Sequence, residues 1–105
     1  MHQPAPSSAA SGVVLDIGSG TGALVLLVDA DREGEEIDTE PAWGAGQHAH
    51  AAVLARSLPS GTVHAVVIAG LPPGAHRILD PRGGPVVAEV RDGAVTEVDL
   101  RTKFT

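Results

Sequence analysis

A chain of 105 residues has room for one small domain, and its formal charge of −6 excludes binding to nucleic-acid phosphates, which needs clustered Lys and Arg. The lack of cysteine excludes a disulfide framework and a thiolate metal site, so we expect a cytoplasmic protein. No apolar run approaches the roughly 20 residues of a membrane span, so we expect no membrane association.

The first twelve residues, MHQPAPSSAASG, have neither the basic start nor the apolar stretch of a signal peptide, and we expect a disordered tail over 1–12. After them, apolar stretches alternate with Gly, Pro, Asp and Ser, which predicts consecutive strands and tight turns. The strands are expected at 13–18, 22–29, 35–40, 48–58, 62–70, 74–80, 85–91 and 95–101. One domain would then cover 13–101, followed by a short tail at 102–105.

This spacing predicts an all-β protein, an antiparallel β-sandwich of seven or eight strands. We expect the last two strands to form a hairpin through Asp92-Gly93-Ala94, with Gly93 at positive φ. Val90 would then lie opposite Thr96, so that the apolar residues of both strands share one face.

The run ALVLLV, from Ala23 to Val28, is apolar on both faces of its expected strand. Two alternatives follow from this pattern. Either the strand is central and covered on both sides, or its outer face meets a protein partner or a second copy of the chain. The second alternative predicts a dimer.

The acidic segment DADREGEEIDTE has the spacing of a calcium-binding loop. Loop positions 1, 3, 5 and 12 hold Asp29, Asp31, Glu33 and Glu40. The alternative interpretation is a solvated turn followed by an edge strand over 35–40, with its carboxylates outward and Ile37 and Thr39 inward.

His48 and His50 form an H-x-H pair on one face of their expected strand, a spacing that zinc can use. His64 is expected roughly 20 Å from His50 along the next hairpin, so it cannot join them. A third ligand would have to come from elsewhere, with His76 as one candidate. The alternative is a set of exposed histidines with ordinary titration.

The string VLDIGSGTG resembles the cofactor loop of S-adenosylmethionine-dependent methyltransferases, in which a helix follows the glycines. That resemblance implies a helix from Thr21, but the residues that follow, ALVLLVDAD, are apolar on every side. The preferred interpretation is a turn in which Gly18, Gly20 and Gly22 reverse one strand into the next. Ser19, Ser57 and Ser60 do not lie in a nucleophile elbow, so we predict no catalytic residue and no cofactor.

The stretch GLPPGAHRILDPRGGPVVAEVRDGAVTEVDLR resembles the end of prealbumin-like β-sandwiches, such as carboxypeptidase regulatory domains and the B-type repeats of collagen adhesins. From about residue 13 to 101 the chain is similar to short actinobacterial proteins with no established function. The resemblance implies a prealbumin-like fold. We therefore expect a small non-catalytic module that binds a protein partner or associates with itself.

Overall fold

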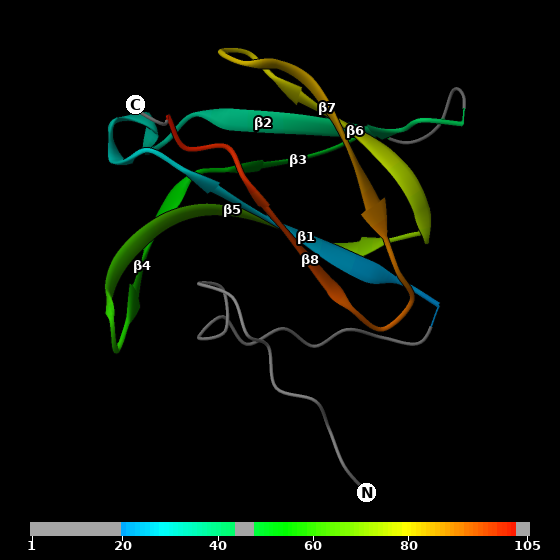
Figure 1. Cartoon of the computed structure of the whole chain (residues 1–105), viewed down its shortest axis with the longest axis horizontal. Coiled ribbons are helices and arrows are strands. Elements are labelled where there is room, and N and C mark those ends of the chain that lie inside the picture. The colour runs from blue at the N-terminus through cyan, green and yellow to red at the C-terminus, as the bar shows by residue number, and fades with distance from the viewer. Residues whose placement is uncertain (1–19, 44–47, 103–105) are drawn as a thin grey trace, which may run out of the picture.

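The computed structural model describes residues 20–43 and 48–102, which form two layers of strands (Figure 1). The strands are β1 (Gly22–Val28), β2 (Glu36–Pro41), β3 (Ala49–Ala52), β4 (Leu54–Leu58), β5 (Gly61–Leu71), β6 (Gly74–Asp80), β7 (Gly84–Val90) and β8 (Val95–Asp99). One 3-10 turn, η2 (Ala30–Arg32), follows β1. The strand expected at 13–18 lies outside the described residues. No helix in the described ranges is long and apolar enough to cross a membrane.

The strands form two four-stranded sheets that pack face to face as a β-sandwich. Sheet A has the order β4-β5-β1-β8, and sheet B has the order β3-β2-β6-β7. The predicted all-β sandwich is confirmed. The strands pair antiparallel, as predicted, except for β1 and β8, which run parallel.

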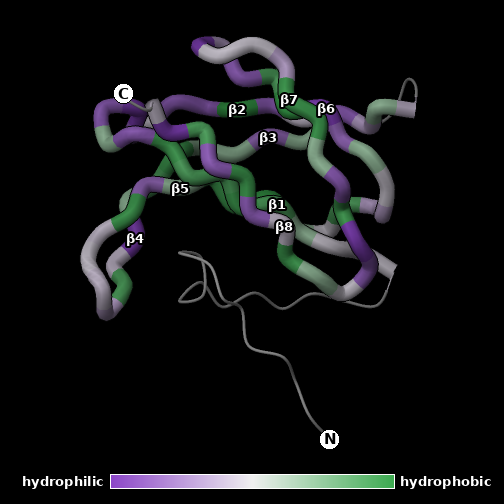
Figure 2. Tube along the Cα trace, viewed as in Figure 1, coloured by the Kyte–Doolittle hydropathy of each residue, from purple (hydrophilic) through white to green (hydrophobic). Residues whose placement is uncertain are grey.

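β1 is the central element of the sandwich, and all seven of its residues are buried. Alternate side chains, Leu24, Leu26 and Val28, enter the main core together with Ile37 and Ile78 of sheet B. The intervening Val25 and Leu27 lie on the other face, in a second apolar cluster with Ala65 of β5. Figure 2 shows this strand and β5 as predominantly apolar, whereas β2 is largely hydrophilic.

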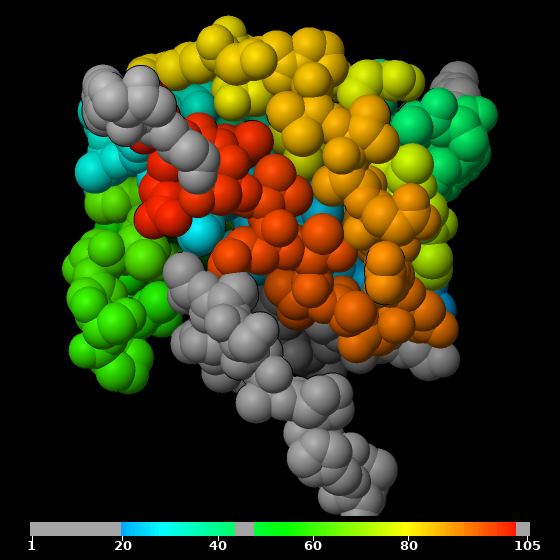
Figure 3. Space-filling model, in the orientation of Figure 1, coloured from blue at the N-terminus to red at the C-terminus, as the bar shows by residue number. Residues whose placement is uncertain are grey.

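The predicted hairpin between the last two strands is wrong. β7 pairs with β6 in sheet B, whereas β8 pairs with β1 in sheet A, with Val98 beside Leu26. The two strands still lie side by side on the face seen in Figure 3. The Thr96 hydroxyl of β8 donates a hydrogen bond to the Glu89 carbonyl of β7 at 2.8 Å. A fully buried β1 needs a backbone partner at each edge, and β8 supplies the second one. Gly93 has positive φ, as expected.

The single strand expected at 48–58 is divided at Val53 into β3 and β4, which belong to different sheets. The Val53 N–H donates to the Glu35 carbonyl at 2.8 Å, and its carbonyl accepts from the Gly34 N–H at 2.9 Å. Because its side chain is also fully buried in the main core, Val53 is the point where the chain crosses from sheet B to sheet A.

The expected inward and outward pattern of β2 is confirmed, since Ile37 and Thr39 are buried. Its expected place at a sheet edge is wrong, because β2 lies between β3 and β6. Its outward carboxylates pair with positive or titratable side chains of both neighbouring strands. On β6, for example, Arg77 Nε donates a hydrogen bond to Glu40 at 3.1 Å.

Two glycines of the VLDIGSGTG string lie in the described range, and they have different roles. Gly20 has a φ of +85°, and its N–H donates to the Asp92 carboxylate at 2.8 Å. At Gly22 a Cβ would stand 2.2 Å from the Arg91 carbonyl oxygen, because the start of β1 passes directly against the turn before β8. Gly22 therefore permits a close backbone approach, whereas Gly20 permits a left-handed turn.

We predict that Gly22→Ala lowers the free energy of unfolding by about 2 kcal/mol, because the added methyl group must push back a backbone carbonyl that cannot rotate away. The matched control is Gly20→Asn, since Asn tolerates positive φ and nothing lies within 4 Å of that Cβ position. Urea unfolding measures both. Equal losses for the two variants would contradict the close approach at Gly22.

Candidate functional site

The structure does not bring the four carboxylates of the candidate calcium loop together. Each one has its own partner on a different part of the surface. The pairs are Asp29 with Thr102, Asp31 with Arg82, Glu33 with His64, and Glu40 with Arg77 and His48. Because the loop folds into η2 and β2, its oxygens diverge instead of converging on one point.

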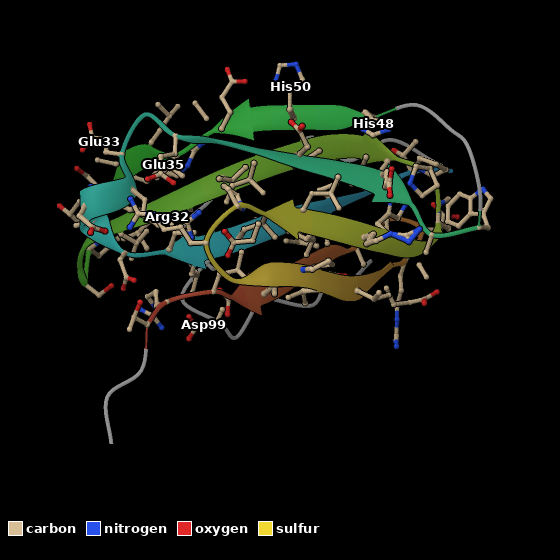
Figure 4. All side chains as sticks on the ribbon, turned by 90° about the horizontal axis from the view of Figure 1, so that it is seen from above. Arg32, Glu33, Glu35, His48, His50 and Asp99 are labelled. Atoms are coloured by element: carbon tan, nitrogen blue, oxygen red, sulfur yellow. The ribbon has the colours of Figure 1, made fainter. Side chains whose placement is uncertain are left out.

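His48 and His50 share the outward side of sheet B, as their spacing predicts (Figure 4). Each one pairs with a carboxylate of β2: His48 Nε2 lies 3.2 Å from Glu40, and His50 Nδ1 lies 3.1 Å from Glu36. His64 is on β5, in the opposite sheet. Over the described ranges, no group of three His, Asp or Glu side chains is arranged to hold a metal ion.

His76, the other candidate ligand, is buried on the inward side of β6. Its Nε2 lies 2.8 Å from the Pro72 carbonyl, and the Trp43 ring packs edge-on against it with centroids 5.1 Å apart. It therefore lies on the opposite face of sheet B from the outward-facing His48 and His50.

The residues that the methyltransferase alternative requires as a helix form β1 instead. Ser19 lies outside the described range. Ser57 and Ser60 are exposed at the β4–β5 hairpin, and none of the described side-chain hydrogen bonds joins either of them to a histidine. The described residues therefore do not place a histidine base against either of these serines.

A buried ion pair, between Arg32 and Asp80, closes one end of the sandwich. Arg32 is 3% exposed, and its guanidinium donates to both Asp80 oxygens, at 2.7 and 3.3 Å. Its Nε donates to Glu35 at 3.0 Å, and Asp80 also accepts the Arg82 N–H at 3.0 Å. The pair ties η2 to the turn between β6 and β7. Sequence reasoning missed it because the two residues are 48 positions apart.

Burial opposes ionisation of Asp80, but the hydrogen bonds from Arg32 and from the Arg82 backbone outweigh it and lower the pKa of the carboxyl. The same contact with Asp80 raises the pKa of Arg32. Hydrogen bonds from Arg32 also lower the pKa of Glu35. All three groups are therefore charged at neutral pH and held by one another, which is the arrangement of a structural network.

A cavity of about 190 Å³ opens beside the ends of β1 and β5. Its lining combines apolar and charged side chains: Leu27, Val28, Asp29, Ala30, Thr62, Val63, His64 and Arg101. Two of the charged groups in this lining already have polar partners. Arg101 pairs with Asp99 at 2.9 Å, and Asp29 accepts the Thr102 hydroxyl at 2.7 Å, a hydrogen bond that lowers the Asp29 pKa.

The described strands leave four sheet edges, at β4, β8, β3 and β7, and three of them carry carboxylates or proline or have only four residues. β8 carries Glu97 and Asp99, β7 carries Pro85 and Glu89, and β3 is only four residues long. Charge, proline and shortness are the features that keep edges from pairing with another chain.

β4 has none of these protective carboxylates or prolines, and three of its five residues are exposed. Leu54 is 50% exposed on the outer side of the sheet. Arg56 is its one charged residue, and no ion pair joins Arg56 to another described side chain. The open edge of β4 is therefore the part of the described surface best suited to strand pairing.

Comparison with family models, with curated proteins and with solved structures found no significant match to this chain.

We predict that Asp80→Asn lowers the free energy of unfolding by about 3 kcal/mol at neutral pH, since it leaves the buried Arg32 without its main counter-charge. Because the pKa of Asp80 is lower in the folded state, its stabilisation is complete above its unfolded pKa of about 3.9 and is lost as pH falls through the folded value. The difference between the two proteins should therefore shrink below about pH 4.

Urea unfolding from pH 7 to pH 2 measures this difference. The matched control is Asp38→Asn, which changes an exposed carboxylate of β2 that has no buried partner. A pH-independent difference between Asp80→Asn and the natural chain would show that the ion pair does not stabilise the fold.

Proposed function

We propose that this chain is a non-catalytic β-sandwich module that associates with a second copy of itself by pairing β4 edge to edge. The observation that carries the proposal is the open edge of β4, with Leu54 half exposed and with no carboxylate or proline along the strand. The prealbumin-like classification and the cytoplasmic location stay predictions.

Charge supports the choice of β4. Each copy has a formal charge of −6, so two copies repel each other over most orientations. The contact must form where carboxylates are absent, and β4 is the edge strand that carries one positive charge and no negative one. Pairing there brings backbone groups together without placing like-charged carboxylates opposite each other.

Hydrogen-bond geometry supports it as well. Leu58 and Gly61 are paired across the two-residue Pro59-Ser60 turn. In such a hairpin the residues alternate between pointing their N–H toward the partner strand and away from it. Ala55 and Ser57 therefore direct their backbone groups to the open edge, where an antiparallel β4 of a second copy can bind them.

The outer face of β1, the other expected contact surface, is less suitable. Val25 is 0% exposed and Leu27 is 2% exposed. Of the two alternatives for this strand, the central strand covered on both sides is the one that fits these values.

We predict that the natural chain forms a concentration-dependent dimer and that Leu54→Lys is monomeric, because a lysine on the edge must lose its hydration when a second strand arrives. The matched control is Val87→Lys, which adds the same charge at another exposed apolar residue, on sheet B. Sedimentation velocity over a range of concentrations measures both. A natural chain that stays monomeric up to its solubility limit would contradict the proposal.

A further inference from the structure

Only part of the β4 edge has backbone groups that are available to a second copy. Within the strand, Ala55 and Ser57 direct their N–H and C=O groups outward, whereas the alternate residues bond to β5. Just before the strand, the N–H and C=O groups of Val53 are already bonded to the segment that precedes β2. Just after it, Pro59 has no N–H to donate. An antiparallel partner strand therefore has to pair with Ala55 and Ser57.

A two-fold axis beside Arg56 pairs both of these residues. It places Ala55 opposite Ser57 of the second copy and Ser57 opposite Ala55, so that each pair exchanges both of its backbone hydrogen bonds. An axis beside Ala55 would place Ser57 opposite Val53, whose groups are occupied. An axis beside Ser57 would place Ala55 opposite Pro59, which cannot donate. The backbone therefore selects the axis beside Arg56.

The same register determines which side chains meet across the axis. Leu54 pairs with Ala65, a member of the second apolar cluster, so Leu54, Arg56 and Leu58 project to the outer side of sheet A. Leu54 lies opposite Leu58 of the second copy, which covers its half-exposed side chain. Arg56 lies opposite Arg56 of the second copy, at a position where the two Cα atoms are about 4.5 Å apart. The dimer therefore brings two guanidinium groups to its axis.

No carboxylate on the two outermost strands of sheet A neutralises this pair of cations. β4 and β5 contain neither Asp nor Glu, and no ion pair joins Arg56 to another described side chain. The Nε of Arg56 is buried and has no hydrogen-bond partner. Like charges directly opposite each other destabilise a strand pair. An oxyanion between the two guanidinium groups removes that repulsion and accepts hydrogen bonds from both, because the guanidinium fork matches the geometry of phosphate.

We infer that the two Arg56 side chains form a binding site for a free divalent oxyanion, such as inorganic phosphate, on the two-fold axis of the dimer. The inference rests on the proposed function, because each copy supplies half of the site. A bound anion stabilises the dimer over the monomer, which offers a single guanidinium group. Association at β4 therefore depends on the concentration of the anion as well as on that of the protein.

Sedimentation velocity in two buffers of equal pH and ionic strength, one with sodium chloride and one with sodium phosphate, tests the site. We expect the dissociation constant of the dimer to be about tenfold lower in phosphate, because the anion adds hydrogen bonds between charged groups. A dimer of equal strength in both buffers would overturn the inference and leave pairing at β4 intact. A monomer in both buffers would overturn both proposals.

Two arginine variants separate a bound anion from the general tendency of phosphate to strengthen association. Arg56→Gln removes the guanidinium group, so we expect its dimer to be equally strong in both buffers. Arg91→Gln is the matched control and should keep the phosphate effect, because Arg91 is exposed and follows β7 of sheet B. A phosphate effect that persists in Arg56→Gln would place the anion elsewhere and overturn the inference.

Disulfide formation tests the register independently of the anion, since the chain has no cysteine of its own. Arg56→Cys places its two cysteines opposite each other on the axis, within the Cα separation that a disulfide spans. In Ala55→Cys the register offsets the two cysteines along the strands, roughly 8 Å apart, which is too far for a bond. We expect mild oxidation to cross-link Arg56→Cys alone. Cross-linking of Ala55→Cys that equals or exceeds that of Arg56→Cys would contradict the register.

Discussion

β1 buries both of its faces in the middle of sheet A, and most of the architecture follows from that constraint. A strand of seven buried residues has no contact with water through its side chains, so its backbone groups need partners on both edges and its side chains need cover on both faces. β5 and β8 provide the edges. Sheet B provides the cover on one face, and the main core of the sandwich forms there.

The same constraint determines which sheet β7 and β8 each belong to. Because β8 is used as the second neighbour of β1, it cannot close a hairpin with β7, and the two consecutive strands are divided between the sheets. The chain also crosses between the layers at Val53, which places β4 in sheet A. β4 lies at one edge of that sheet and has no described neighbour on its open side.

Charge is distributed around this apolar centre in local pairs. On the outer side of sheet B, Glu36 faces His50 of β3 and Glu40 faces His48, which directly precedes β3. The buried Arg32–Asp80 pair holds one end of the sandwich. These contacts explain how an acidic strand such as β2 can occupy the interior of a sheet.

The sequence was sufficient to predict the elements that depend on local pattern. The strand of residues 74–80, the alternation of Ile37 and Thr39, and the positive φ of Gly93 all follow from neighbouring residues, and the structure confirms them. Pairing partners are not local. The parallel contact of β8 with β1 and the break at Val53 depend on which strand needs a neighbour, and a periodic pattern does not contain that information.

The candidate site divides in the same way. The shared face of His48 and His50 follows from their spacing. The carboxylates at positions 29–40, which the calcium-loop alternative would bring together, diverge because η2 turns the chain between Asp31 and Glu35. The Arg32–Asp80 pair joins segments 48 residues apart. A buried charge pair between residues so far apart in the sequence can be recognised only once the fold has brought the two segments together.

Amide hydrogen exchange at two protein concentrations tests most directly the claim that a doubly buried β1 leaves β4 as the pairing edge. We predict that the amides of Val25 and Leu26 exchange slowest at both concentrations, and that those of Ala55 and Ser57 slow as the concentration rises while β8 is unchanged. Exchange at Ala55 and Ser57 that is independent of concentration, or slowing at β8 instead, would contradict the account.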